Sequence, residues 1–286
     1  MKQEYIDTVR LLIEVAPVVF RSPRFAMKGG TALNLFVQDM PRLSVDIDVV
    51  FTGPPLLREE ALAAIETDLK DITASLEAQG LSTAHPRKAS GDDVKLFISD
   101  GKVEVKVEVN HVFRGSLLPV QSIKLALAAQ DMFTSDLSVP MLETAELYGS
   151  KLVAAMDRQH PRDIFDVLKM YESFGLEAGF VDCFVAYLAG HGRPVHEVLF
   201  SNDAPFDKVF ESHFRGMTMD EALSQNHKDF LLSLVKLEPA WEVMPFDGLK
   251  DLPALKWKLL NLEKLKNKSR DSFARQYTEL EVRFGE

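Results

Sequence analysis

The 286-residue sequence has little cysteine and no apolar run long enough to cross a bilayer. Its one cysteine, Cys183, excludes an intrachain disulfide and is typical of a reducing compartment, so we expect a cytoplasmic protein with no membrane partner. The N-terminal segment is acidic and amphipathic, unlike a secretory signal peptide. A hydrophobic content of 46% and a charged content of 27% are typical of a soluble globular chain.

Common catalytic motifs are also absent. The sequence has no Walker-type loop, no Gly-x-Gly-x-x-Gly and no Gly-x-Ser-x-Gly nucleophile elbow. His191 and His196 have an unusual spacing for zinc, so we expect neither to be a ligand. A net charge of −10 argues against a general nucleic-acid binder. Residues 255–270 are locally basic, however. They are either a candidate for RNA backbone contact or an ordinary solvated helix face.

Hydrophobic patterning divides the chain into a mixed front part and a helical back part. Helical periodicity covers residues 5–19 and 56–80, and a further helix is expected from Thr31. Residues 43–51 read as a strand, and 94–110 as a hairpin turning at Asp100-Gly101. We therefore predict an α+β fold with two domains, residues 1–125 and residues 126–286.

Two aspartates interrupt the strand-like segment. Side chains alternate along a strand, so Ser44, Asp46 and Asp48 share one face, and the apolar residues between them face the core. Two neighbouring carboxylates repel unless a cation lies between them, and Mg²⁺ prefers such oxygen ligands. The pair therefore predicts a metal site for phosphoryl or nucleotidyl transfer. The alternative is a solvated strand end.

A paired glycine precedes these aspartates at the expected start of a helix. Gly29 and Gly30 would let a phosphate approach the backbone closely. Thr31 could cap the helix or contact a phosphate oxygen, and Lys28 adds a positive charge. The alternative is an ordinary turn.

Together, "KGGTAL" and "RLSVDID" resemble the glycine-pair and Asp-x-Asp signature of the DNA polymerase β-like nucleotidyltransferase superfamily. They are more specifically similar to the AbiEii/AbiGii toxin family, which includes the MenT tRNA-modifying toxins. The resemblance implies that Asp46 and Asp48 bind the metal, with Asp46 catalytic. It implies nucleotide-binding roles for Lys28, Gly29, Gly30, Thr31 and Ser44.

A third acid is expected on a neighbouring strand, because superfamily members commonly place one there. The segment "KVEVKVEVN" offers Glu104 and Glu108, and Glu108 is the preferred candidate, because "VKVEVN" resembles the family's pattern with Lys106 beside the acid. Glu108 could orient the attacking hydroxyl, bind metal or act as a base. The alternative is a charged solvent face on an antiparallel strand.

A later cluster lies between residues 141 and 172. Lys151 and Arg158 share one helix face, and Asp163 and Asp166 share a face of the next helix, which Pro161 begins. From the residues alone, this pattern is equally typical of a salt-bridge network between two helices. It is also similar to the second AbiEii signature. That likeness implies that Lys151, and less firmly Arg158, contacts the nucleotide, and that Asp163 or Asp166 positions Lys151 or serves the acceptor.

The resemblance implies a polymerase β-like nucleotidyltransferase domain with a mixed sheet, followed by a helical domain that completes the active-site cleft. It implies a toxin of a toxin–antitoxin system that transfers NMP from NTP to the 3′ end of tRNA, releases pyrophosphate and inhibits translation. Mg²⁺ would be the cofactor, and the partners would be NTP, tRNA and a cognate antitoxin. The alternatives are a nucleotidyltransferase acting on a protein or small molecule, and a catalytically silent nucleotide-binding protein.

Overall fold

A computed structural model describes residues 1–54, 56–85, 94–110, 114–175, 177–193, 197–198 and 207–218. The basic segment 255–270 and His196 lie outside these residues. The chain forms two compact units. One comprises Met1–Leu147 with Phe214–Glu221, and the other comprises Tyr148–His213 with Ala222–Glu286. Within the described ranges, no helix is long and apolar enough to span a membrane.

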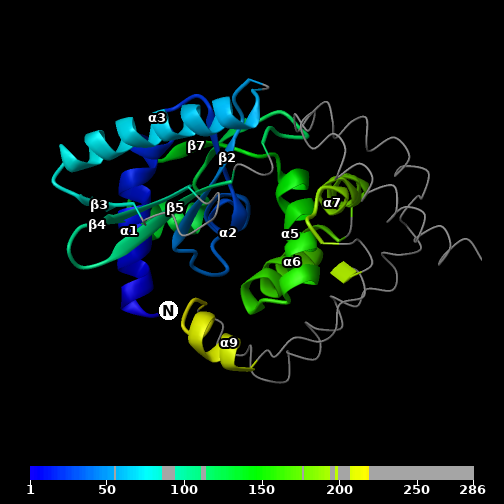
Figure 1. Cartoon of the computed structure of the whole chain (residues 1–286). Helices are drawn as coiled ribbons and strands as arrows, with labels where there is room; N and C mark the ends of the chain where they lie inside the picture. Colours follow the sequence, from blue (N-terminus) through cyan, green and yellow to red (C-terminus); the bar gives the residue numbers. More distant parts are fainter. Residues whose placement is uncertain are drawn as a thin grey trace, which may run out of the picture. The chain divides into compact units, whose positions relative to one another are not determined.

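A seven-stranded mixed sheet forms the centre of the first unit, in the order β3-β4-β5-β2-β1-β7-β6 (Figure 1). β2 is parallel to β5, and β1 is parallel to β7, whereas the other neighbours are antiparallel. The strands are β1 (Phe25–Lys28), β2 (Asp46–Phe51), β3 (Ser82–Ala84), β4 (Val94–Ser99), β5 (Glu104–Asn110), β6 (Gln121–Lys124) and β7 (Ser138–Met141). This sheet with its helices confirms the predicted α+β class.

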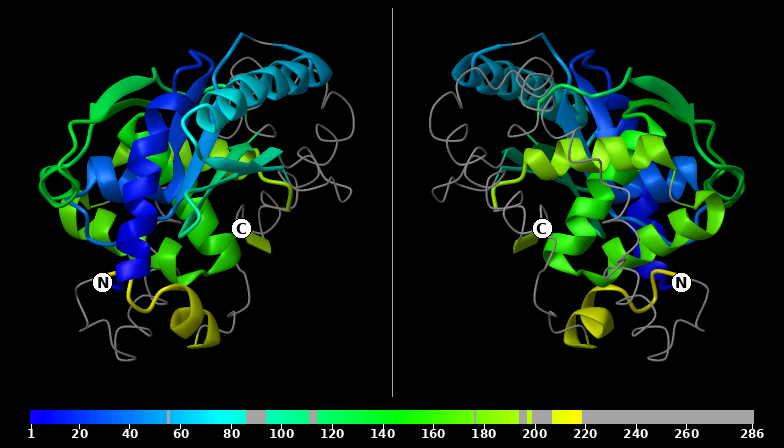
Figure 2. Two further views of the ribbon diagram at one scale, coloured as in Figure 1. Left: turned by 90° about the vertical axis from the view of Figure 1, so that its left-hand side faces the viewer. Right: turned by 90° about the vertical axis from the view of Figure 1, so that its right-hand side faces the viewer.

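Two long helices accompany the sheet. α1 (Gln3–Val19) packs against β2 and β5 and contacts α3 (Arg58–Glu77), and both helices are seen beside the strands in Figure 2. Apolar residues of α1 and α3 are fully buried together with Ile47 and Val107 of the sheet. At the other end of the sheet, the short α4 (Leu127–Phe133) connects β6 to β7. Burial of this apolar layer is the main favourable contribution to folding.

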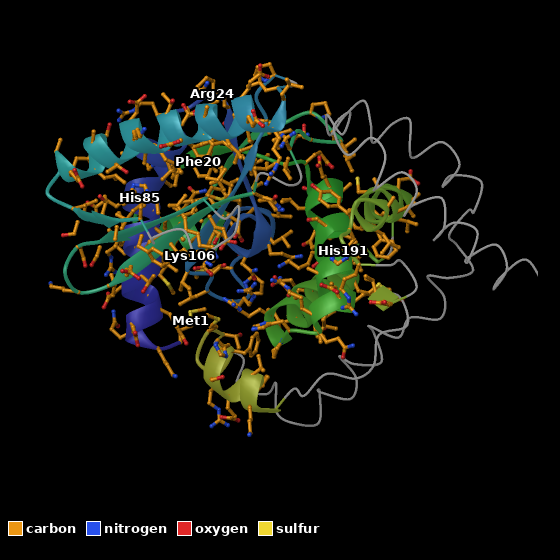
Figure 3. The ribbon with its side chains drawn as sticks, viewed as in Figure 1. Met1, Phe20, Arg24, His85, Lys106 and His191 are labelled. Atoms are coloured by element: carbon orange, nitrogen blue, oxygen red, sulfur yellow. The ribbon has the colours of Figure 1, made fainter. Side chains whose placement is uncertain are left out.

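Arg24 fixes α3 to the residues that precede β1. Its guanidinium contacts both carboxylate oxygens of Asp68, with Nε donating to Oδ2 over 2.9 Å, and Figure 3 labels Arg24 beside α3. Ser22 donates a further hydrogen bond to the same carboxylate over 3.0 Å. This ion pair raises the pKa of Arg24. The contact orients the long helix on the sheet.

The β4–β5 hairpin confirms the turn predicted at Asp100-Gly101. Ser99 pairs with Glu104, which leaves a four-residue loop. The Asp100 carboxylate accepts hydrogen bonds from the backbone amides of Lys102 and Val103 over 2.8 and 2.9 Å. Gly101 takes a left-handed φ of +89°, which glycine adopts without steric cost. Local turn chemistry therefore sets the register of β5.

The second helix starts earlier than the sequence predicts. α2 spans Gly29–Ala32 and continues as a π-helical segment, η1 (Leu33–Val37). Gly29 has a φ of +77°, so the chain passes from β1 into helix without a loop. A residue with a side chain would be strained there, and for this reason the glycine motif itself forms the first turn.

The second unit consists of helices in the described residues: most of α5 (Thr144–Arg158), with α6 (Pro161–Phe174), α7 (Ala178–Ala189) and α9 (Asp207–His213). Gly149 lets α5 and α7 pack backbone to backbone, because a Cβ there would lie 2.5 Å from the Cβ of Cys183. Cys183 is buried in the apolar helix α7. The predicted division between residues 125 and 126 falls inside the first unit, since β7 completes its sheet.

Candidate functional site

The two aspartates lie on β2 and face away from its apolar side. Asp46 and Asp48 are partly exposed, whereas Ile47 and Val49 are fully buried. This alternation is the one expected from the sequence, and it resolves the apparent conflict of carboxylates within an apolar strand. Ser44 precedes the strand and is buried.

The parallel pairing of β2 with β5 enlarges this charged face. The register sets Asp46 beside Lys106 and Asp48 beside Glu108. Neighbouring carboxylates such as Asp48 and Glu108 repel each other unless positive charge lies nearby. The register thus places Glu108 next to the Asp-x-Asp pair, as the sequence predicts, although β2 and β5 are far apart in the chain.

Lysines supply that positive charge. The Lys106 Nζ lies 2.9 Å from Glu108 Oε2 and 3.8 Å from Asp46 Oδ1, and Figure 3 labels it on β5. The Lys95 Nζ, from β4, lies 3.9 Å from the same Glu108 oxygen. Partial burial lowers the pKa of Lys106, but the hydrogen bond to Glu108 and the nearby carboxylates outweigh it, so the pKa is raised. Lys106 is therefore charged at neutral pH.

The glycine motif lies directly against the second aspartate. A Cβ on Gly29 would lie 2.1 Å from Oδ2 of Asp48, so only glycine leaves room for this carboxylate. Lys28, one residue earlier, pairs with Asp48 across β1 and β2. The structure thus brings Lys28 and Gly29 together with Asp48, as the sequence motif predicts.

Beneath the motif lies a buried arginine. Arg42 is only 2% exposed, and its Nη1 donates to the Leu43 carbonyl over 2.9 Å. A Cβ on Gly30 would lie 2.8 Å from Arg42 Nη2 and 3.0 Å from Ser44 Oγ. Gly30 and Ser44 are therefore packed together with the Arg42 guanidinium. The segment before β2 is fixed against the glycine motif by this packing.

The sequence suggests that Thr31 caps the helix or contacts a phosphate oxygen, but the structure places its side chain elsewhere. Its side chain is fully buried, and its hydroxyl donates a hydrogen bond to the backbone carbonyl of Asp46. This bond fastens α2 to the start of β2. Asn34, which sequence reasoning missed, reaches back and donates to the Gly30 carbonyl over 2.9 Å. The two contacts position the glycine motif relative to the aspartates, which makes Thr31 a structural support of the site.

In the second unit, the later cluster forms a buried ion-pair network. The Lys151 Nζ lies 2.9 Å from Asp163 Oδ1 and 3.1 Å from Asp166 Oδ2. Arg158, whose side chain is 60% exposed, approaches Asp163 Oδ2 with Nη2 at 2.7 Å. A salt-bridge network between two helices is one interpretation of this sequence pattern, and the structure contains such a network between α5 and α6. Both aspartates hold the ammonium group of Lys151.

Two neighbouring groups at this network have lowered pKa values, for different reasons. Burial raises the pKa of Asp163, but the attraction of Lys151 and Arg158 outweighs it and lowers the pKa to about 2. Burial and the charge of Arg162 lower the pKa of His160 to about 4. The His160 Nδ1 accepts from the Arg162 backbone amide over 3.2 Å and caps α6. His160 is therefore neutral at pH 7, and Asp163 is ionised.

Glu146, in the first turn of α5, has a structural role in the first unit. Its carboxylate is fully buried and accepts hydrogen bonds from the backbone amides of Leu117 and Leu118 over 2.9 and 3.1 Å. These bonds fix the loop before β6 to the first turn of α5. Burial of a carboxylate requires such partners.

The chemistry of the β2 face fits a hard divalent cation. Asp46 and Asp48 offer only oxygen donors, and such a cation takes one or two carboxylates together with water and substrate phosphates. Among the residues that the structure describes, no group of three or more His, Cys, Asp or Glu residues is arranged to hold a metal by itself. The two aspartates therefore fit a metal that keeps coordination positions open for water and substrate phosphates.

The comparisons with known proteins agree with this geometry. The family model described as "Nucleotidyl transferase AbiEii toxin, Type IV TA system" matches residues 10–260. The solved structure of MenT4, a nucleotidyltransferase toxin from Mycobacterium tuberculosis H37Rv, matches with a TM-score of 0.61 and 14% identity, over 96% of this chain and 95% of that one. At that identity, the likeness shows a shared fold.

Two further comparisons add nothing to this assignment. The CdnC:HORMA-deltaN complex of E. coli MS115-1 aligns over 91% of both chains at 12% identity, but its TM-score of 0.28 is too low to support a common fold. The comparison with curated proteins found no match. The family match covers most of the sequence, and the chain therefore belongs to the AbiEii nucleotidyltransferase toxin family of type IV toxin–antitoxin systems.

Proposed function

We propose that this toxin transfers a nucleoside monophosphate from an NTP to the 3′ end of tRNA, releases pyrophosphate and so inhibits translation in the cytoplasm. The observation that carries the proposal is the contact of the Asp48 carboxylate with Gly29, beside Asp46 on the same strand face. A carboxylate pair for a metal and a glycine motif for phosphates are thereby adjacent. Nucleotidyl transfer requires both elements.

Asp46 and Asp48 would hold Mg²⁺. When bound, this ion would neutralise charge on the triphosphate and favour ionisation of the attacking hydroxyl. Gly29 and Gly30 would allow the phosphates to approach the backbone, and Lys28 would add a positive charge. The acceptor oxygen forms a bond to the α-phosphorus while the bond to the pyrophosphate oxygen breaks, and the hydroxyl proton is released. Electrostatic stabilisation of the phosphates contributes most of the rate.

Glu108 would orient the acceptor, because its carboxylate is held by the Lys106 ammonium at 2.9 Å beside the Asp48 position. Ser44 is buried against Gly30 and would act through the glycine motif.

Lys151 would contact the phosphates of the nucleotide, with Asp163 and Asp166 as positioning residues. Its ammonium group contacts both carboxylates, so its position is strongly determined. Arg158 is largely exposed, which suits a second contact with the nucleotide. A cognate antitoxin is the expected protein partner, because the family is one of toxin–antitoxin systems.

The acceptor can be identified with α-labelled NTPs. The full-length protein is incubated with Mg²⁺, each NTP in turn, and either total tRNA or a cell extract. We expect label at the 3′ end of tRNA, which 3′-terminal digestion would release. Label only in protein or in small molecules would contradict the tRNA proposal, and the absence of transfer to any acceptor would favour a silent nucleotide-binding protein.

A further inference from the structure

The charged face of the sheet extends beyond the proposed metal site to a residue that the sequence motifs do not include. Strand register aligns four charged residues in one row across β1, β2, β5 and β4, in the order Lys28, Asp48, Glu108 and Lys95. We infer that Lys95 binds a phosphate of the acceptor RNA next to its reacting 3′ end, while Lys106 remains paired with Glu108. This inference rests on the proposed function.

The direction of transfer favours this end of the row for the acceptor. Lys28 and Gly29 lie on the β1 side of Asp48, so the triphosphate belongs there. The attacking and leaving oxygens lie roughly in line through the transferred phosphorus. The acceptor must therefore approach from the side away from the leaving pyrophosphate. Along this row, that side is formed by β5 and β4.

Distances along the row suit a single nucleotide. Neighbouring strands lie about 4.8 Å apart, which puts Lys95 roughly 10 Å from Asp48, two strands away. A lysine side chain and one nucleotide can bridge this separation. A phosphate held by Lys95 would leave the terminal hydroxyl close to Glu108 and the aspartates.

The lysine contacts differ in closeness, and this difference supports the assignment. Lys106 contacts Glu108 at 2.9 Å, whereas Lys95 is 3.9 Å from the same oxygen, and the two lysine side chains are similarly exposed. Lys106 is therefore the closer counter-ion of Glu108, and it would continue to neutralise this carboxylate when Lys95 contacts a phosphate. The neighbouring row pairs Asp46 with Lys106. Across the two rows, the three carboxylates Asp46, Asp48 and Glu108 are balanced by three lysines, Lys28, Lys95 and Lys106. A dication added to this face makes it positive, and RNA binding requires positive charge.

The alternative is that Lys95 only neutralises Glu108 and has no contact with RNA. A purely structural role would change stability and leave RNA affinity unaffected. A third possibility is that Lys95 contacts the NTP. These cases are distinguished by measuring RNA binding and NTP use separately in one variant.

The test compares the full-length wild type with Lys95→Gln and with Lys70→Gln, a matched loss of one positive charge on the exposed face of α3. Fluorescence anisotropy with 5′-labelled tRNA, in Mg²⁺ without NTP, gives affinity at several salt concentrations. We expect Lys95→Gln to weaken binding several-fold and to reduce the salt slope by about 0.7, the value for one contact with a single strand. Lys70→Gln should match the wild type, and the KM for NTP should be unchanged in both variants.

Two results would overturn the inference while leaving the proposed function intact. The first is equal RNA affinity in the wild type and Lys95→Gln with an unchanged KM for NTP, which would indicate a structural role. The second is equal RNA affinity with a raised KM for NTP, which would indicate contact with the nucleotide. In either case, the wild type would still label tRNA. If the wild type labels no RNA at all, the proposed function fails together with the inference.

Discussion

The Asp48 carboxylate lies so close to Gly29 that a Cβ on the glycine would be 2.1 Å from Oδ2. Gly29 also has a φ of +77°, which strains any other residue. Strand β2 and the start of α2 therefore pack against each other at Asp48 Oδ2, with no room for a side chain at Gly29. Position 29 tests this fit directly.

We expect Gly29→Ala to reduce nucleotidyl transfer at least about a hundred-fold, because the methyl group displaces the Asp48 carboxylate, which we propose as a metal ligand. Gly101→Ala is the matched control, since Gly101 has a φ of +89° with open space around it. It carries the backbone strain without the clash. Transfer assays and thermal unfolding of both variants make the comparison. Equal activity in the two alanine variants would contradict the predicted role of the contact.

The buried network around Lys151 predicts unequal losses of stability. Lys151→Met leaves two buried carboxylates without their shared cation, which should cost about 3–5 kcal/mol of unfolding free energy. Arg158→Ala removes a largely exposed partner and should cost about 1 kcal/mol or less. Urea unfolding monitored by circular dichroism measures both. Equal costs would contradict the burial of the Lys151 charge.

A triple variant separates stability from catalysis at the same position. Lys151→Met combined with Asp163→Asn and Asp166→Asn removes all three charges together, so stability should recover relative to Lys151→Met alone. If Lys151 contacts nucleotide phosphates, transfer stays low in the recovered protein. Recovery of activity together with stability would show that Lys151 is only structural.

His160 predicts a pH dependence of stability. Burial, with the charges of Arg162, Arg158 and His213, lowers its pKa from 6.5 to about 4, against the opposing attraction of Asp163. Between pH 6.5 and 4, the unfolded chain binds a proton that the folded chain does not. The free energy of unfolding therefore falls as the pH falls through this window.

His160→Asn keeps a side chain that can cap α6 and removes the titration. We expect a smaller loss of stability between pH 6.5 and 4 in this variant than in the wild type. NMR titration of the ring should give a midpoint near 4. A midpoint at or above 6.5, or equal slopes in the two proteins, would contradict the burial of the neutral imidazole.

Local sequence patterns were sufficient to predict several features. Alternation in the segment around Asp46 located the charged face, and Pro161 marked the start of α6. The chemistry of Asp100-Gly101 identified the β4–β5 hairpin. Each of these features depends on residues close together in the chain, where dihedral preference and side-chain direction decide the structure.

Other features depend on pairings that no local pattern reveals. Lys95 lies beside Glu108 and in one row with Asp48 only because β4 pairs with β5 and β5 lies parallel to β2. The alternation of β4, counted from the hairpin, could have placed Lys95 opposite Glu108. The sequence pattern is typical of a helix cap at Thr31, but in the folded protein its hydroxyl donates a hydrogen bond to the backbone carbonyl of Asp46.

The central claim is that Asp46 and Asp48 support metal-dependent nucleotidyl transfer to tRNA. The most direct measurement is transfer of label from α-labelled NTP to tRNA by the wild type, Asp46→Asn, Asp48→Asn and the control Glu104→Gln, which alters an exposed residue of β5. We predict labelling by the wild type and the control in Mg²⁺ but not in EDTA, and a loss of at least about a hundred-fold in both asparagine variants. Undiminished transfer by both folded asparagine variants would contradict this account.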